Sequence, residues 1–177
     1  MSFENEQISN WENLDLNTNL LRGIYSYGFE NPSPIQQKAI KPILDGKDVI
    51  AQSQSGTGKT GCFVIASLQK IDIKLDEAQI IIMAPTRELS IQIKNVITEI
   101  ANYIKELKTY LLIGGQSTDN DISNFRYETP HIIVGCPGRI NEMLRRKYLN
   151  AKSIKLIILD EADEMLSQGF KEQVYNI

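Results

Sequence analysis

The 177-residue sequence lacks the residues on which several classes of protein depend. It has two cysteines and one histidine, so neither a disulfide framework nor a zinc site built from Cys and His is supported. Reduced thiols of this kind are typical of a cytosolic or nuclear compartment. No uninterrupted apolar run exceeds five residues, and the first ten residues are neither basic nor apolar. The sequence therefore predicts no membrane span and no secretory signal.

Neither sign of charge is in large excess. The chain carries 19 Lys and Arg against 22 Asp and Glu, a formal net charge of −3. This argues against a surface that binds polyanions everywhere, but it is compatible with a local basic groove. With 42% hydrophobic and 23% charged residues, the composition is that of an ordinary globular domain.

Short β-branched runs alternate with helical patterns along the chain. The runs predict buried strands at residues 48–51, 80–84, 110–113, 132–134 and 156–159. Helices are predicted at residues 17–27, 33–44, 86 to about 106, and 137–149. This alternation favours an α/β fold with a mostly parallel sheet between helices, whose ligands collect at the C-terminal ends of the strands. Residues 1–10 are expected to be a polar tail and residues 11–177 one domain.

A Gly-rich loop follows the first predicted strand and precedes an apolar helical run. It consists of Ser53, Gln54, Ser55, Gly56, Thr57, Gly58, Lys59 and Thr60. Small residues let successive N–H groups point at phosphate oxygens, so the spacing predicts a nucleotide-binding P-loop. Lys59 would then contact the β- and γ-phosphates, and Thr60 would ligate Mg²⁺. Ser53 stands where the general pattern has glycine, and a flexible turn before a core helix is the alternative.

The strand predicted at residues 156–159 leads directly into acidic residues. Asp160 at the end of this strand would hold Mg²⁺, and Glu161 would orient and deprotonate an attacking water. A solvated acidic loop is the alternative interpretation, and the presence of the P-loop weighs against it.

Together these segments resemble the first RecA-like domain of the DEAD-box RNA helicases. The motifs follow in collinear order from about residue 11 to 177: residues 28–36 with Trp11 upstream, 55–60, 85–89, the pair 114–115, 137–139, and 160–163, which read Asp-Glu-Ala-Asp. Residues 20–25 and 163–170 look most like the translation initiation branch of the family, and the exon-junction relative is close. The resemblance implies a three-layer RecA-like fold.

The resemblance also assigns a base-binding role to two residues ahead of the P-loop. Gln36 would read the adenine edge and Phe29 would pack on the base, which implies a preference for ATP over GTP. Capping of its own helix is the alternative role for Gln36, because Ser33 three residues earlier completes a capping box. Both roles are compatible with each other.

RNA contacts are implied at three further motifs along one edge of the sheet. These would involve Pro85, Thr86, Arg87, Gly114, Gly115, Pro137, Gly138 and Arg139. Contacts of this type address sugar and phosphate, so single-stranded or duplex RNA would bind with little sequence preference. A helix cap, a turn and solvated arginines are the alternatives. The sequence departs from the family pattern at Ser90, normally alanine, and at Cys136, normally threonine.

The family further implies parts that are not found within these residues. A Ser-Ala-Thr segment, which Asp163 would contact, and a second RecA-like domain with an arginine finger are expected in the full protein. The resemblance thus implies an RNA-stimulated, Mg²⁺-dependent ATP hydrolase that clamps RNA and separates its strands. It also implies a location in the cytoplasm or nucleus, no membrane partner, and initiation factors of the cap-binding complex as protein partners. An ATP-gated RNA clamp of the exon-junction type, or another P-loop enzyme such as a GTPase or kinase, is the alternative.

Overall fold

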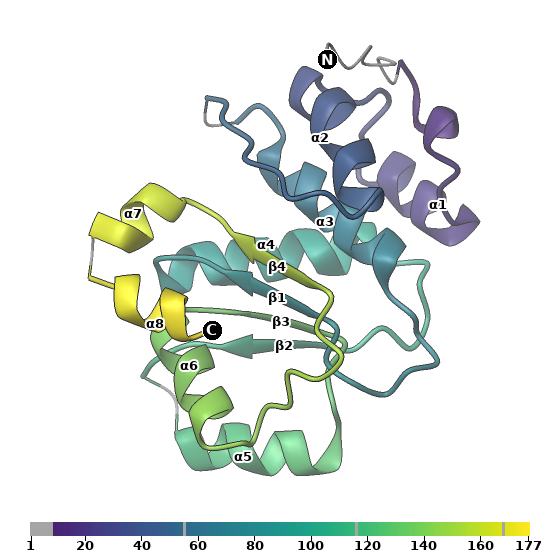
Figure 1. Ribbon diagram of the computed structural model, residues 1–177. Helices are drawn as coiled ribbons and strands as arrows, with labels where there is room; N and C mark the ends of the chain where they lie inside the picture. Colours follow the sequence, from purple (N-terminus) through teal and green to yellow (C-terminus); the bar gives the residue numbers. More distant parts are fainter. Residues whose placement is uncertain (1–8, 55, 116, 168) are drawn as a thin grey trace. The chain divides into compact units, whose positions relative to one another are not determined.

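The computed structural model describes residues 9–54, 56–115, 117–167 and 169–177 (Figure 1). They form two compact units. The loop unit comprises Met1–Lys70 and Val96–Lys105, and the sheet unit comprises Ile71–Asn95 and Glu106–Ile177. No helix in these described ranges is long and apolar enough to cross a membrane.

The loop unit is built from helices. A 3₁₀-helix, Trp11–Leu14, precedes α1 (Thr18–Ser26), α2 (Pro34–Leu44) and α3 (Lys59–Lys70), which confirms the helices predicted at residues 17–27 and 33–44. Proline occupies the first turn of α2, and Gly46 follows its end with a φ of 78°. The Lys70 ammonium donates to the carbonyls of Ile43 and Leu44 at 3.3 and 3.4 Å. These bonds supplement the backbone contacts at the last turn of α2, where the Ile43 carbonyl also accepts from the Gly46 N–H at 3.1 Å.

The prediction of a strand at residues 48–51 is wrong. These residues adopt no regular structure, and Ile50 is fully exposed. A β-branched run forms a strand only where a neighbouring strand accepts its backbone hydrogen bonds. All strand pairs of the described residues lie in the sheet unit instead.

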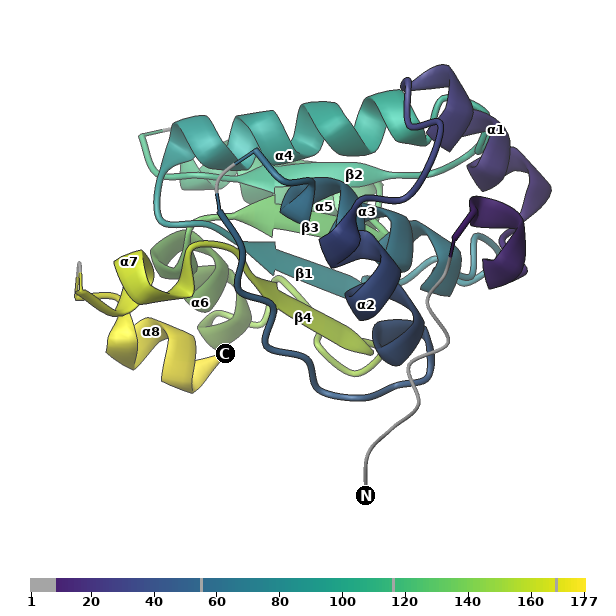
Figure 2. The same cartoon turned by 90° about the horizontal axis from the view of Figure 1, so that it is seen from above.

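The sheet unit holds four parallel strands. They are β1 (Ile80–Met83), β2 (Thr109–Leu112), β3 (Ile132–Gly135) and β4 (Leu156–Leu159), in the order β2-β3-β1-β4 (Figure 2). The last residues of the four strands are paired with one another: Met83 pairs with both Gly135 and Leu159, and Leu112 pairs with Gly135. The four strands therefore end together at one edge of the sheet, as the sequence predicted.

Three helices connect these strands: α4 (Arg87–Ile100), α5 (Thr118–Tyr127) and α6 (Pro137–Arg145). Two more, α7 (Ala162–Ser167) and α8 (Lys171–Asn176), follow β4. One buried cluster joins the sheet to α5, α6 and α7, which Figure 1 draws in green and yellow; its members are Ala78, Ile81, Met83, Leu112, Ile122, Ile133, Ile140, Met143, Leu149 and Met165. Because side chains alternate along a strand, Ile80 and Ile82 face the opposite side of the sheet.

Two helix ends differ from the prediction. α4 ends at Ile100 rather than near residue 106, and α6 ends at Arg145 rather than at residue 149. Glu106 and Lys147 adopt left-handed φ angles of 66° and 61°, which a continuing right-handed helix does not allow. No prediction named α5, whose residues are largely polar.

His131 holds the segment ahead of β2, and Gln79 holds the loop ahead of β1. The backbone N–H of Lys108 donates to His131 Nδ1 at 3.1 Å, and burial lowers the pKa of this imidazole. The Gln79 side chain accepts from the Asp72 N–H at 2.9 Å and donates to the Asp72 and Leu75 carbonyls at 2.7 and 3.1 Å. These are structural roles.

Candidate functional site

The P-loop residues wind into the first turn of α3 through two glycines with positive φ. Gly56 has a φ of 78° and Gly58 a φ of 97°. A Cβ at Gly58 would lie 2.9 Å from Gln36 Nε2 and from Ser33 Oγ, so there is no room for a side chain at this position. Ser55 lies outside the described residues. Both φ angles lie in the left-handed region that glycine adopts without strain.

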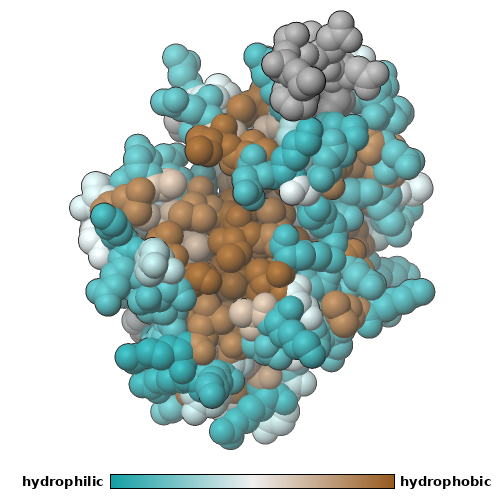
Figure 3. Space-filling view, viewed as in Figure 1, coloured by the Kyte–Doolittle hydropathy of each residue, from teal (hydrophilic) through white to brown (hydrophobic). Residues whose placement is uncertain are grey.

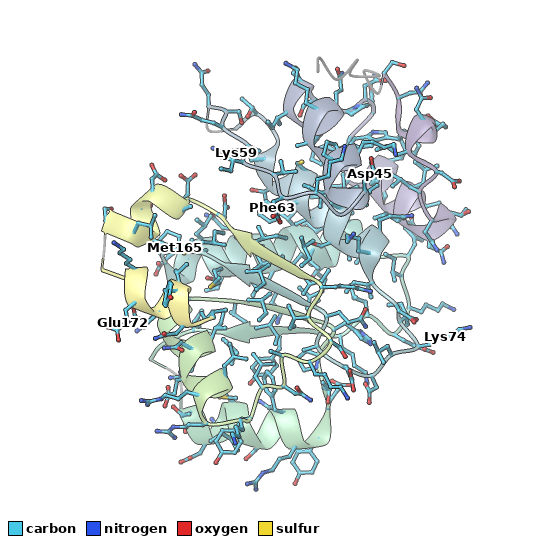
Figure 4. The ribbon with its side chains drawn as sticks, in the orientation of Figure 1. Asp45, Lys59, Phe63, Lys74, Met165 and Glu172 are labelled. Atoms are coloured by element: carbon cyan, nitrogen blue, oxygen red, sulfur yellow. The ribbon has the colours of Figure 1, made fainter. Side chains whose placement is uncertain are left out.

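The P-loop is closed on itself by its own polar groups. Lys59 Nζ, in the residue labelled in Figure 4, donates to the Ser53 carbonyl at 2.9 Å. The Ser53 and Thr57 hydroxyl oxygens lie 2.7 Å apart, and the Thr57 hydroxyl donates to the Gln54 carbonyl at 2.8 Å. The Lys59 ammonium has three N–H donors, of which this bond uses one. Thr60 follows Lys59 in the first turn of α3.

Gln36 joins the start of α2 to the P-loop. Its Oε1 accepts from the Ser33 backbone N–H at 2.8 Å, which is the capping bond, and its Nε2 donates to the Gly58 carbonyl at 3.1 Å. The side chain is buried. Ser33 and Gln36 thus form the capping box that the sequence indicated, beside Gly58 of the P-loop.

Phe29 stands in an aromatic cluster against α3. Its ring stacks on Trp11 at 6.5 Å and meets Tyr27 edge to face at 4.8 Å, and its carbonyl accepts from Trp11 Nε1 at 2.9 Å. A Cβ built at Gly61 would lie 2.6 Å from Phe29 Cε2. Gly61 therefore makes room for the ring beside the P-loop helix, a role that the sequence reasoning missed.

The remaining motif residues lie where the parallel strands end. Pro85 and Thr86 follow β1, Gly114 and Gly115 follow β2, and Pro137 opens α6 after β3. The pairing of the strand ends places these three segments at one edge of the sheet. The structure thus brings together residues that the sequence placed apart.

Thr86 and Arg87 shape the start of α4. The Thr86 hydroxyl accepts from the Leu89 N–H at 3.1 Å, as an N-cap does. Arg87 is exposed, and its guanidinium covers the glycine pair: a Cβ at Gly114 would lie 3.4 Å from Arg87 Nη2, and one at Gly115 would collide with Nη1. Gly115 also has a φ of 84°. Both glycines therefore permit the close approach of a cation to this turn.

The two departures from the family pattern contact each other. Ser90 is fully buried, donates to the Thr86 carbonyl at 2.9 Å, and has its Oγ 3.9 Å from Cys136 Sγ. Cys136 occupies the N-cap position of α6 without a side-chain capping bond, and burial raises the pKa of its thiol. A Cβ built at Gly138 meets nothing within 4 Å, so the backbone here borders open space.

Arg139 differs from Arg87 in its surroundings. Its side chain is only 9% exposed and pairs with Asp121 of α5, which is 1% exposed. Arg139 Nε also lies 3.4 Å from a Glu142 carboxylate oxygen. Sequence reasoning missed Asp121, for which an acidic residue in the first turn of a helix was the available signal.

The acidic motif begins where β4 ends. Asp160 is buried, and its N–H donates to the Met83 carbonyl at 2.9 Å. Glu161 has a left-handed φ of 51°, an arrangement that costs a non-glycine residue roughly 1 kcal/mol. Asp163 is exposed in the first turn of α7. Strained backbone of this kind is common at functional sites.

Among the residues that the structure describes, no cluster of three His, Cys, Asp or Glu could hold a metal ion. The oxygen donors predicted for Mg²⁺ are Thr60 in the loop unit and Asp160 in the sheet unit. Hydroxyl and carboxylate oxygens are the donor types that Mg²⁺ prefers, together with water and substrate phosphate.

Curated relatives with similar sequences are translation factors by name. The chain is 52% identical over 167 residues to the ATP-dependent RNA helicase eIF4A of Scheffersomyces stipitis. It is 53% identical over the same length to the ATP-dependent RNA helicase eIF4A of Candida albicans. Each match covers 94% of this chain and 42% of the relative, so the chain spans about two fifths of their length.

Solved structures of similar proteins have the same fold. A DEAD box protein from the hyperthermophile Methanococcus jannaschii superposes with a TM-score of 0.88 at 37% identity, over 95% of this chain and 46% of that one. S. cerevisiae Dbp5 bound to RNA and ADP BeF3 superposes with a TM-score of 0.82 at 33% identity, over 95% of this chain and 42% of that one. The fold is thus the RecA-like arrangement expected from the sequence. The sequence pattern of the DEAD/DEAH box helicases matches residues 33–177, and the chain belongs to this family.

Proposed function

We propose that this chain is the ATP-binding part of an ATP-dependent RNA helicase that acts in translation initiation in the cytoplasm. The names of the two curated relatives support the activity and favour a helicase over a static RNA clamp. The bound ligands of Dbp5, RNA and ADP BeF3, support an RNA and a nucleotide as ligands. A second RecA-like domain and initiation factors of the cap-binding complex are the proposed partners in the longer protein.

The nucleotide would bind at the P-loop of the loop unit. Gly56, Gly58 and the N-terminus of α3 supply phosphate-facing N–H groups, and Lys59 would move from the Ser53 carbonyl to the phosphates. Ser53, Gln54, Ser55 and Thr57 complete this loop. Mg²⁺, held through Thr60 and Asp160, would neutralise charge on the phosphates.

The base would lie near Gln36 and Phe29. The Gln36 amide keeps one N–H and one oxygen lone pair beyond its two bonds to Ser33 and Gly58, which suffices for one adenine edge. Capping and base reading are therefore compatible. Phe29 supplies an aromatic face of the kind on which a base packs.

The observation that carries the RNA proposal is the row of motif segments at the ends of β1, β2 and β3. An exposed guanidinium, that of Arg87, covers the turn of Gly114 and Gly115, and Gly138 borders open space. Pro85, Thr86, Pro137 and Arg139 would complete this RNA edge. Backbone N–H groups and arginine contact phosphates without reading bases, so little sequence preference follows.

ATP hydrolysis would use Glu161 as the base that activates water, with Lys59 and Asp160 at the phosphates. Asp163 would couple this site to the RNA edge. An arginine finger contributes on the order of 10³ to 10⁵ in rate in P-loop systems, so without a second domain the chain is expected to bind ATP with negligible turnover.

Binding of a fluorescent ATP analogue to the chain tests the nucleotide site. Lys59→Ala is expected to weaken binding by about a hundredfold, because the ammonium meets the phosphates directly. Lys74→Ala, at an exposed position labelled in Figure 4, is the matched control and should leave binding unchanged. ATP should displace the analogue and GTP should not. Equal displacement by GTP would contradict the role of Gln36.

Turnover in the longer protein with its second domain tests Glu161. Glu161→Gln should retain ATP binding and lower RNA-stimulated hydrolysis by about 10² to 10⁴, the usual contribution of a general base. Glu172→Gln in α8 is the control. Unchanged hydrolysis in Glu161→Gln would reject this residue as the base.

A further inference from the structure

A polar network with a buried ion pair at its centre connects α5, α6 and β2. Asp121 accepts from Arg139 and, at 3.0 Å, from the Tyr110 hydroxyl, which in turn accepts from Asn124 Nδ2 at 2.8 Å. The Asp121 and Arg139 side chains are 1% and 9% exposed. Burial raises the pKa of the Tyr110 hydroxyl, which therefore stays a neutral donor to the carboxylate.

The charges of this network are balanced by partners within the sheet unit. Arg139 is paired with Asp121 and lies 3.4 Å from Glu142, and Glu142 lies 3.1 Å from Arg146. Buried charges persist when both are paired and hydrogen-bonded, and removing one partner leaves the other uncompensated. The pair therefore holds α5 and α6 together strongly.

The position of the pair links it to two motif segments. α5 follows the turn of Gly114 and Gly115, and Arg139 lies in the first turn of α6, which Pro137 and Gly138 open. Any shift of α5 against α6 would change the distance between these two segments. Arg87, in contrast, is exposed at the same edge and is the arginine accessible to a phosphate.

We propose that Asp121 is a positioning residue for RNA binding, which acts by holding Arg139 inside the sheet unit. Through this pair the glycine turn and the start of α6 would keep a fixed spacing at the RNA edge. Arg139 then contributes to RNA affinity through position rather than through its charge. This inference rests on the proposed function of the RNA edge.

Four variants separate position from charge. Asp121→Asn removes the buried carboxylate that pairs with Arg139, which keeps Glu142 of α6 as an acidic neighbour. Arg139→Gln leaves the buried Asp121 carboxylate without its arginine partner. The double variant with both changes replaces the ion pair by two amides that can still bond to each other. Asp119→Asn, an exposed acid on the same helix, is the matched control.

Affinity for a fluorescein-labelled oligouridylate is measured at a series of salt concentrations, with the affinity for a fluorescent ADP analogue and the thermal unfolding midpoint in parallel. Asp121→Asn is expected to weaken RNA binding by about tenfold, with nucleotide affinity unchanged, because the guanidinium loses its buried partner on α5 and keeps Glu142 of its own helix. Asp119→Asn should stay within about twofold of the wild type, since surface charges act weakly. The double variant should recover RNA affinity to within about threefold and keep the wild-type salt dependence.

The salt dependence decides between the two roles of Arg139. A phosphate contact contributes about 0.7 to the slope of log affinity against log salt for a single strand. If the double variant stays weak and its slope falls by that amount, Arg139 contacts phosphate directly and the positioning role is wrong, while the proposed function stands. If Asp121→Asn unfolds, the double variant still decides. A wild-type chain that binds nucleotide but no RNA would reject the RNA edge and this inference with it.

Discussion

The loop unit and the sheet unit turn similar sequence signals into different structures. Residues 48–51 and β1 are both short runs rich in β-branched residues, yet Ile50 is fully exposed while Ile80 and Ile82 are completely buried. β1 has a strand on each side. Residues 48–51 belong to a unit whose described elements are helices. Strand formation thus depends on neighbours, whereas the glycine geometry of the P-loop forms without a strand before it.

The two units also differ in how their motif residues are held. In the loop unit, Lys59 and Gln36 bond to backbone carbonyls of the P-loop itself. In the sheet unit, Arg139 bonds to a side chain that comes from another helix. The Lys59 bond joins residues close in sequence, and the Gln36 bond is a single contact between α2 and the P-loop. The Arg139–Asp121 pair forms only when the sheet places α5 beside α6. Changes in the sheet should therefore affect RNA binding more than nucleotide binding.

Hydrogen exchange of the 177-residue chain should show the largest contrast between the units. The amides of Ile81 and Ile82 lie in a central strand and should exchange at least about 10³-fold more slowly than those of Val49 and Ile50. Mass spectrometry of overlapping peptides measures both segments in one experiment. Equal protection would mean that residues 48–51 are paired in solution and would remove the contrast.

Two glycine substitutions test the units separately. Gly58→Ala introduces a Cβ at a φ of 97° and 2.9 Å from Gln36 Nε2, so it should cost about 1–3 kcal/mol of stability and most of the nucleotide affinity. The Cβ of Gly138→Ala would meet open space, so this variant should have the stability and the nucleotide affinity of the wild type. Thermal unfolding and binding of an ATP analogue measure the two effects. A tolerant Gly58→Ala would show that the P-loop rearranges freely.

The smallest expected effect is a pH dependence confined to the sheet unit. Burial lowers the pKa of His131, so the unfolded chain binds a proton at a higher pH than the folded chain does. Stability should then fall as the pH drops through about 6.5, the ordinary histidine value, and level off below the folded pKa. Protonation would also remove the acceptor for the Lys108 N–H.

Chemical unfolding of the wild type and of His131→Gln between pH 5 and pH 8 measures this dependence. His131 is the one histidine in the sequence, so the variant should lose the component near pH 6.5. The charged groups near His131 are Lys108, which opposes its protonation, and Asp76 and Glu128, which favour it. A wild type that is as stable at pH 5.5 as at pH 7.5 would contradict the assignment.

Most of the fold could be predicted from local patterns. The strands β1 to β4 and the helices α1, α2 and α6 follow from β-branched runs, amphipathic spacing and Pro or Gly at helix ends. α5 was missed because its apolar residues are few, and the sheet order depends on crossovers that no local window contains. Residues 48–51 failed because β-propensity does not supply a partner strand.

The site was predictable in composition but not in contacts. Lys59, the glycines and the acidic motif follow from spacing. The Arg139–Asp121 pair does not, because the parallel crossover from α5 through β3 to α6 brings these residues together. The left-handed φ of Glu161 and the room that Gly61 gives Phe29 are likewise products of packing.

The two cysteines differ enough in burial for a spectroscopic reporter to be attached at one of them. Cys62 is buried in α3, and burial raises the pKa of its thiol to about 12, so it carries almost no thiolate at neutral pH. Cys136 is only half-buried and stands at the start of α6. Burial raises the pKa of the Cys136 thiol too, but this side chain is less buried than Cys62, so a maleimide dye should label position 136 faster than position 62. Its emission would report directly on what happens at the ends of the strands.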